Sequence, residues 1–271
     1  MKTTLLIRPA ARGGKYLGAD AANSRHESAL VIISNAQNQK PVAVGIAQAP
    51  DKASAGPSNL MDPVSRCDPF AADSQTVQVQ LSVDIDEPTT FTVTVLGPLS
   101  FLDQASVTQT DIIVLPGVNI GLDPKLPEGL VIEIPGLCIS GVTAVLKGPQ
   151  LSAFAKVTMM CGCPIKYGKT NPGWFWPDTD FTIQLVTFTQ SGATYFYTLS
   201  FDNNPALTSS FTGAWPNKAP NDPVVSAWIY ASEPKLGNQG KYRIHPLSRT
   251  LAIQPKVRKV LAAAGYDPKK K

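Results

Sequence analysis

The chain has 271 residues, of which 43% are hydrophobic and 16% are charged, and it contains 24 prolines and 20 glycines. This length favours two domains that each bury a core, and the hydrophobic content excludes a disordered chain. The many turn-forming residues and the low charge disfavour long solvated helices and indicate an all-β protein.

The net charge of +4 is concentrated at the C-terminal end. Residues 241–271 carry nine basic side chains and one acidic side chain, a net charge of +8, whereas the rest of the chain carries −4. Such a segment suits contact with an acidic partner, another subunit, nucleic acid or a membrane surface, and it also occurs as a solvated tail. Nucleic acid is not the expected partner. The basic residues predicted to bind a partner are Lys256, Arg258, Lys259, Lys269, Lys270 and Lys271.

Targeting signals are not visible in this sequence. Its first residues, MKTTLLIR, include only three consecutive strongly apolar side chains, whereas a secretory signal needs about 7 or more. No run reaches the roughly 18 apolar residues of a membrane helix. We therefore expect no membrane span, and a protein that is cytoplasmic or is exported by a route not visible here.

Strand patterns begin at the N-terminus. Short apolar or alternating runs bounded by Gly, Pro, Asn and Asp predict strands at residues 3–7, 29–34, 42–47, 76–85, 89–96 and 111–115. The clearest is 77–85, where odd positions are apolar and even positions are polar, so one face must meet a core. The connector Asp86-Glu87-Pro88 predicts a hairpin with the next strand.

The second half continues this style with more aromatic residues. Strands are predicted at residues 130–134, 141–146, 152–160, 181–189, 194–201, 210–212, 224–232 and 242–245. The connector at 190–192 joins two of them as a hairpin. Near the end, four apolar residues at helical spacing follow Pro255 and precede Gly265, which predicts one short amphipathic helix. They are Val257, Val260, Leu261 and Ala264.

These elements together predict two tandem immunoglobulin-like β-sandwich domains, followed by a short helix in a basic tail. The predicted domains cover residues 1–116 and 128–245, with a Pro- and Gly-rich linker at 117–127 and the tail at 246–271. The second domain contains the Cys-Gly-Cys motif. The antibody-type Cys…Trp…Cys spacing is absent, so the immunoglobulin-like label concerns architecture and does not imply a function.

The Cys161-Gly162-Cys163 motif is the first candidate site. If residues 159–163 continue a strand, Met159, Cys161 and Cys163 share one face and align three sulfurs. Thiolates bind Zn or Cu(I), and a thioether favours copper, so one copper or zinc ion is possible. A redox-active thiol pair or disulfide is a second interpretation, and buried sulfur packing without a cofactor is a third. Cys67 and Cys138 lie in other segments.

An aromatic segment follows the cysteines. In an extended chain, Trp174 and Trp176 would point the same way, with Asp178 and Asp180 offering acceptors just beyond. Such a platform binds sugars or apolar partner surfaces, which makes a carbohydrate-binding module one possible function. The alternative is that at least one tryptophan fills the end of a sandwich, because aromatic side chains dominate the cores of small β-domains.

Catalytic patterns are sparse. His26 and His245 are the only histidines, and neither lies near a recognisable nucleophile motif. Phosphate-binding and dinucleotide-binding glycine patterns are also missing. We therefore expect a protein that is not an enzyme: a structural or interaction protein that self-associates or binds a protein partner through sheet edges, loops or the basic tail. A thiol redox or metal-handling protein is the alternative.

Two short motifs resemble a known group. Residues 8–15 (RPAARGGK) and 159–164 (MMCGCP) are similar to those of poorly characterised bacterial two-domain immunoglobulin-like β-sandwich proteins. The resemblance spans both halves up to about residue 245. It implies the tandem sandwich fold, and it implies no activity.

Overall fold

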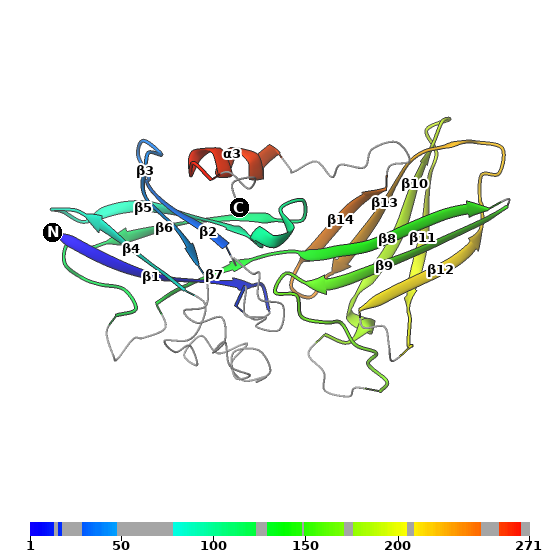
Figure 1. The fold of residues 1–271 in the computed structure, drawn as a ribbon, viewed down its shortest axis with the longest axis horizontal. Helices are drawn as coiled ribbons and strands as arrows, with labels where there is room; N and C mark the ends of the chain where they lie inside the picture. Colours follow the sequence, from blue (N-terminus) through cyan, green and yellow to red (C-terminus); the bar gives the residue numbers. More distant parts are fainter. Residues whose placement is uncertain are drawn as a thin grey trace. The chain divides into compact units, whose positions relative to one another are not determined.

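The computed structural model describes residues 1–13, 16–17, 29–47, 78–122, 129–147, 149–170, 176–204, 209–244 and 255–266. It confirms an all-β fold, and within these ranges it has one short α-helix, near the C-terminus (Figure 1). The chain divides into two compact units, residues 1–135 with 253–271, and residues 136–252. No helix in the described ranges combines the length and the apolar character needed to cross a membrane.

The described part of the first unit contains seven strands in two sheets. They are β1 (Lys2–Ala11), β2 (Ala29–Asn35), β3 (Pro41–Ala47), β4 (Val79–Asp84), β5 (Thr89–Gly97), β6 (Ser106–Val114) and β7 (Leu130–Ile134). One sheet has the order β4-β1-β7, and the other has the order β3-β2-β5-β6. Buried aliphatic side chains of both sheets, such as Leu5, Ile7, Val31, Ile33 and Val93, form the core.

The predicted hairpin between residues 77–85 and 89–96 is wrong. β4 pairs with β1, whereas β5 pairs with β2 and β6, so the connector at 86–88 crosses from one sheet to the other. Both strands alternate as predicted, and both bury one face in the same core. Alternation cannot distinguish two paired strands from two strands that face each other across a core.

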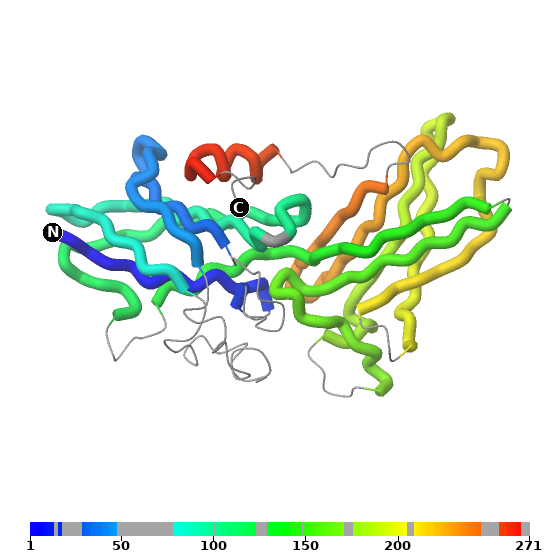
Figure 2. Tube along the Cα trace, in the orientation of Figure 1, coloured from blue at the N-terminus to red at the C-terminus, as the bar shows by residue number. Residues whose placement is uncertain are grey.

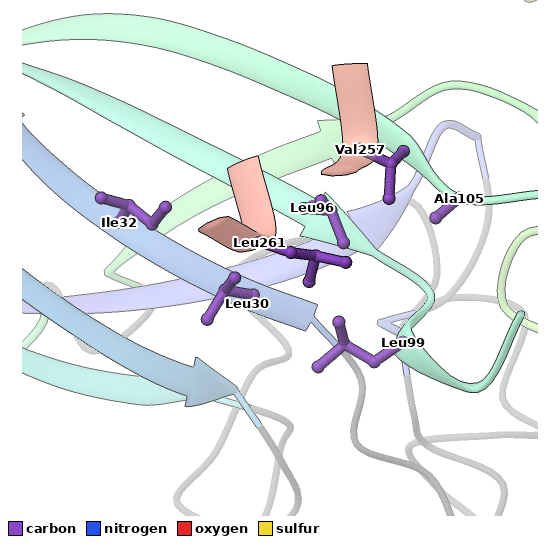
Figure 3. Packing of buried hydrophobic residues seen from close by; sticks show 7 residues of the cluster. All are labelled: Leu30, Ile32, Leu96, Leu99, Ala105, Val257 and Leu261. Atoms are coloured by element: carbon purple, nitrogen blue, oxygen red, sulfur yellow. The ribbon is translucent and has the colours of Figure 1, made fainter. Parts of the chain in front are cut away.

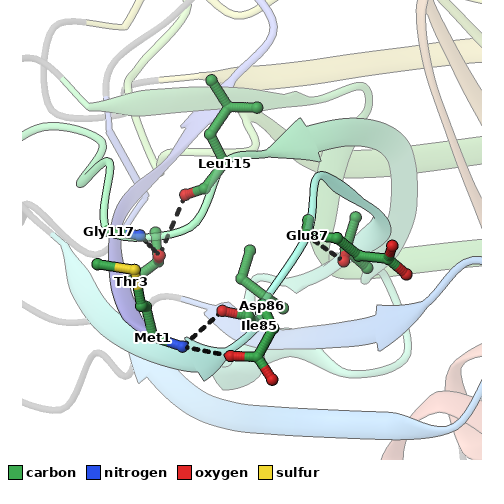
Figure 4. Close-up of polar contacts among 8 residues, drawn as sticks. Met1, Thr3, Ile85, Asp86, Glu87, Leu115 and Gly117 are labelled. Atoms are coloured by element: carbon green, nitrogen blue, oxygen red, sulfur yellow. Dashed lines mark hydrogen bonds and ion pairs between the residues drawn. The ribbon is translucent and has the colours of Figure 1, made fainter.

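Polar contacts fix the start of β1, the central strand of its sheet (Figure 4). The Thr3 hydroxyl donates to the Leu115 carbonyl at 3.2 Å and accepts from the Gly117 amide at 2.8 Å. The α-amino group of Met1 donates to the Ile85 carbonyl at 2.6 Å and lies 3.0 Å from the Asp86 carboxylate. These contacts tie β1 to the turns that follow β4 and β6.

The helix α3 (Pro255–Ala263) covers the outer face of the second sheet of this unit. Val257 and Leu261, one turn apart, are buried against side chains of β2, β5 and the segment after β5 (Figure 3). The other buried residues in this cluster are Leu30, Ile32, Leu96, Leu99 and Ala105. β2 and β5 are therefore buried on both faces, one by the core and one by α3.

A glycine-dependent motif ends α3 where the sequence predicted. Gly265 has φ +65°, and its amide donates to the Ala262 carbonyl at 3.1 Å. The Tyr266 amide donates to the Leu261 carbonyl at 2.9 Å, which completes a Schellman motif. The Tyr266 ring packs against the α3 cluster, and its partial burial raises the pKa of the phenol above its ordinary value.

The units do not follow the predicted domain boundaries. β7 was expected to open the second domain, but it pairs in parallel with β1 of the first unit. The segment at 253–271, expected to be a separate tail, belongs to the first unit through α3. The boundary therefore lies between Pro135 and Gly136, and not at 117–127.

The second unit is one seven-stranded sheet that folds back on itself. Its strands are β8 (Leu137–Lys147), β9 (Gln150–Met159), β10 (Thr182–Thr189), β11 (Thr194–Phe201), β12 (Ser210–Pro216), β13 (Val224–Glu233) and β14 (Asn238–Ile244). Their order is β14-β13-β10-β11-β12-β9-β8 (Figure 2). β10 and β11 form the predicted hairpin. Only two residue pairs join β11 to β12, and the sheet turns there into two facing layers.

A buried polar contact brings the two ends of this sheet together. The Asn238 side chain, at 0% exposure, accepts from the Gly136 amide at 2.9 Å and donates to the Glu233 carboxylate at 3.3 Å. A Cβ atom on Gly240 would lie only 2.5 Å from the Leu137 carbonyl oxygen. The start of β14 thus touches the start of β8, and the unit approaches a closed barrel.

Candidate functional site

The Cys-Gly-Cys motif forms a tight reverse turn at the end of β9. The Gly162 amide donates to the Met159 carbonyl at 2.8 Å, and the Met159 amide donates to the Cys163 carbonyl at 3.1 Å. Gly162 has φ +78°, a conformation that other residues rarely adopt. This turn places the Sγ atoms of Cys161 and Cys163 2.8 Å apart.

The predicted row of three sulfurs on one strand face is wrong. β9 ends at Met159, which is fully buried in the core, and the chain reverses through Met160 and Cys161. The thiol of Cys138 on β8 donates instead to the Met160 sulfur at 3.5 Å. The motif therefore contains one close pair of thiols, those of Cys161 and Cys163. Met160, which precedes the motif, contacts Cys138 instead.

This thiol pair offers two ligand atoms or one disulfide bond. Cys161 is 9% exposed and Cys163 is 6% exposed, so both sulfurs lie just below the surface. Within the described ranges, no three His, Cys, Asp or Glu side chains gather in a way that could hold a metal ion. Cys67, His26 and His245 fall outside these ranges. The copper or zinc ion stays a prediction.

The predicted tryptophan platform does not form at Trp176. Trp176 is 4% exposed, and its backbone carbonyl accepts a hydrogen bond from the Lys166 backbone amide at 3.1 Å. The Asp178 carboxylate accepts from the Gly168 amide at 2.7 Å, and Asp180 pairs with Lys235 at 2.8 Å. The segment thus folds onto the body of the unit, and Trp176 fills the core. Trp174 lies outside the described residues.

The basic residues of the tail divide into two groups. Lys256, Arg258 and Lys259 are exposed on α3, on the side away from the buried Val257 and Leu261. The other predicted residues, Lys269, Lys270 and Lys271, lie outside the described ranges. Three cations on a packed helix form a small basic surface, and their partner role stays a prediction.

Strand β6 presents an edge that the sequence analysis did not identify as a site. Among the described strands it pairs only with β5, through nine consecutive residue pairs without a bulge. It has no proline and one charged residue, Asp111. At its end, Ile113 is 70% exposed, and Leu115 and Val118 beyond it are 47% and 53% exposed. The sequence did contain one signal for this exposed apolar surface. Ile112 and Ile113 are adjacent, and a half-buried strand must expose one of two adjacent side chains.

Comparisons with known proteins give weak structural matches. No protein-family model and no curated protein matches the chain. A DUF3823 family protein from Bacteroides ovatus is 9% identical, over 89% of this chain and 96% of its own, with a TM-score of 0.29. One from Parabacteroides merdae is 8% identical, over 90% and 98%, with a TM-score of 0.23. A marsupial T cell receptor is 9% identical, over 92% and 72%, with a TM-score of 0.23.

Proposed function

We propose that this protein is a non-enzymatic interaction protein that self-associates by pairing β6 with the β6 strand of a second copy. The observation that supports it is the free backbone edge of this strand, with which no second described strand pairs. Natural edge strands are protected by lysine, proline, bulges or short length, because unpaired backbone groups recruit other strands. β6 has none of these features over nine residues, and it ends in a strongly exposed isoleucine.

The other edge of the same sheet provides a contrast. β3 begins with Pro41, and its pairing with β2 is irregular at Ser34, whereas β6 pairs regularly with β5. It is therefore the protected edge. If two β6 strands pair antiparallel about Thr110, Asp111 meets Gln109 of the other copy and no two carboxylates face each other. Such a twofold contact would extend the sheet across both copies.

Replacing Ile113 with lysine is expected to convert a dimer into a monomer. The substitution places a charge on the edge strand and removes its most exposed apolar side chain. Light scattering coupled to size-exclusion chromatography, over micromolar to submillimolar protein, measures the mass. Leu236→Lys, at a leucine that is 44% exposed in the turn after β13 of the second unit, is the matched control and should stay dimeric. A wild-type protein that stays monomeric throughout contradicts self-association, and capture of a different protein through β6 would redirect the proposal to that partner.

A second candidate function is a thiol redox couple at Cys161 and Cys163, supported by their 2.8 Å sulfur separation. A disulfide oxidant such as oxidised glutathione would accept two electrons and two protons from the thiols, forming one Cys161–Cys163 bond and releasing two glutathione thiols. The buried position of the sulfurs slows this exchange, and the strained three-residue ring makes the bond easy to reduce.

Oxidation of the wild-type protein is expected to remove two titratable thiols and the mass of two hydrogen atoms, both restored by dithiothreitol. Cys161→Ser and Cys163→Ser should each abolish the change, and Cys138→Ser, at a buried cysteine outside the pair, should not. Elemental analysis of the same samples tests the metal alternative, since one copper or zinc ion lost in both single variants would assign a metal site. Unchanged thiol counts and no bound metal would leave the turn as sulfur packing.

A further inference from the structure

The second unit contains a cavity of about 270 Å³ between its facing layers. β8 and β9 line one side with Ala144 and Leu151, and β10, β13 and β14 line the other with residues that include Leu185, Thr187 and Ile244. β8 and β14 touch at their starts, near Leu137 and Gly240, and the cavity lies toward their other ends. It therefore occupies the mouth of the nearly closed barrel, a common position for ligand sites.

The lining is apolar and uncharged. Among the described residues that form it, eight are aliphatic, three are the neutral polar residues Thr187, Asn217 and Ser226, and none is charged. At the rim, Leu146 is 51% exposed and Val225 is 53% exposed, so apolar surface continues from the cavity to its opening. An uncharged lining disfavours phosphates, carboxylates and ammonium ions, because a buried ion needs a charged or strongly polar partner.

Thr187 carries one polar group of this cavity. Its side chain is 2% exposed, and no described residue hydrogen-bonds to its hydroxyl, although nearly all buried polar groups in proteins have a partner. The Asn217 amide, in contrast, already bonds to the backbone of Ala219 through both of its polar atoms. The Thr187 hydroxyl is thus the buried group that a ligand can satisfy.

We propose that this cavity binds a compact, neutral, mainly apolar molecule whose single hydrogen-bonding group pairs with the Thr187 hydroxyl. An apolar cavity of about 150 Å³ holds a benzene molecule, so 270 Å³ has room for a two-ring compound or a short branched chain. Bound there, the ligand contacts Leu151 and Leu185 at the floor and covers Leu146 and Val225 at the rim. This site is independent of β6, which lies in the first unit.

Binding of 2-naphthol and naphthalene to the full chain tests this proposal. The two probes share a ring system and differ by one hydroxyl group, so 2-naphthol should bind the wild-type protein more tightly. Thr187→Val keeps the side-chain shape and removes the hydroxyl, and it should weaken 2-naphthol binding about tenfold, the effect of one net hydrogen bond. Its affinity for naphthalene should not fall. Titration calorimetry measures both affinities, and equal losses for both probes would overturn the assigned role of Thr187.

A filling variant tests the location. Ala144→Trp places an indole in the cavity and should abolish binding of both probes. Val145→Trp, at the next residue of β8, points to the opposite face, where Val145 is 55% exposed and does not line the cavity, and it should leave both affinities unchanged. Absence of 2-naphthol binding to the wild-type protein would overturn the proposal, and so would undiminished binding to a folded Ala144→Trp variant.

Discussion

Replacing Leu261 with alanine is expected to lower the free energy of unfolding of the first unit by about 3 kcal/mol. Leu261 is 4% exposed and, with Val257, is one of two buried residues of α3, so it supplies much of the apolar surface that holds the helix on the sheet. The truncation also leaves a void against Leu30, Leu96 and Leu99. An isolated nine-residue helix is not stable in water, so weakened packing should release α3 as a whole.

Hydrogen exchange distinguishes release of α3 from uniform destabilisation. In the Leu261→Ala variant, amides of α3 should lose protection first, while the core strands β2 and β5 keep most of theirs. Lys259→Ala, at an exposed position on the same helix, should change stability by less than about 0.5 kcal/mol. Chemical denaturation of both variants should show the difference in one transition, that of the first unit. Wild-type protection of α3 in Leu261→Ala would refute the assignment of α3 as a packed cover.

The helix itself could be predicted from the sequence, but its place in the fold could not. Its signals depend only on residues close together in the sequence. Apolar side chains recur at helical spacing, at Val257, Val260, Leu261 and Ala264, and Gly265 marks the end of the helix. The surface that receives α3 consists of Leu30, Ile32 and Leu96, more than 150 residues earlier in the chain. Periodicity identifies an apolar face without identifying what covers it, so the segment was expected to be a separate tail.

The candidate sites show the same division between local and long-range information. Cys161 and Cys163 were expected to share one face with Met159, because the alternation rule assumed that the strand continued through Gly162. Gly162 allows a turn with positive φ, and the turn brings the two thiols together in a different way. Trp176 follows the alternative that the sequence also allowed, a tryptophan that fills the core, because residue type alone does not say which side of an extended segment faces the protein.

Sites created by the folded sheet were beyond sequence reasoning. Thr187 lies in a predicted strand, and its residue type gives no sign that its hydroxyl lies in the barrel mouth without a partner among the described residues. That follows only from the facing positions of β8, β9, β13 and β14. The edge at β6 is similar, because whether a predicted strand is central or at an edge depends on sheet order. Sheet order is set by contacts between distant segments.

The barrel closure at Asn238 is expected to be the most charge-sensitive point of the second unit. Asn238→Asp should lower its free energy of unfolding by about 3 kcal/mol at pH 7, because a carboxylate oxygen would replace the amide that donates to Glu233. Both side chains are at most 3% exposed, so neither charge is solvated. Like charge and burial should raise the pKa of the introduced carboxyl group in the folded state.

The pH dependence of this variant supplies the decisive measurement. With a raised folded-state pKa, the folded protein binds more protons than the unfolded chain at intermediate pH, so its stability increases as pH falls. The deficit relative to wild type should therefore shrink between pH 7 and pH 4 in denaturant titrations. Asn238→Ala removes the bonds to Gly136 and Glu233 without adding a charge, and its deficit, about 2 kcal/mol, should change little over this range. Parallel pH profiles for the two variants would mean that Glu233 does not face residue 238 in solution.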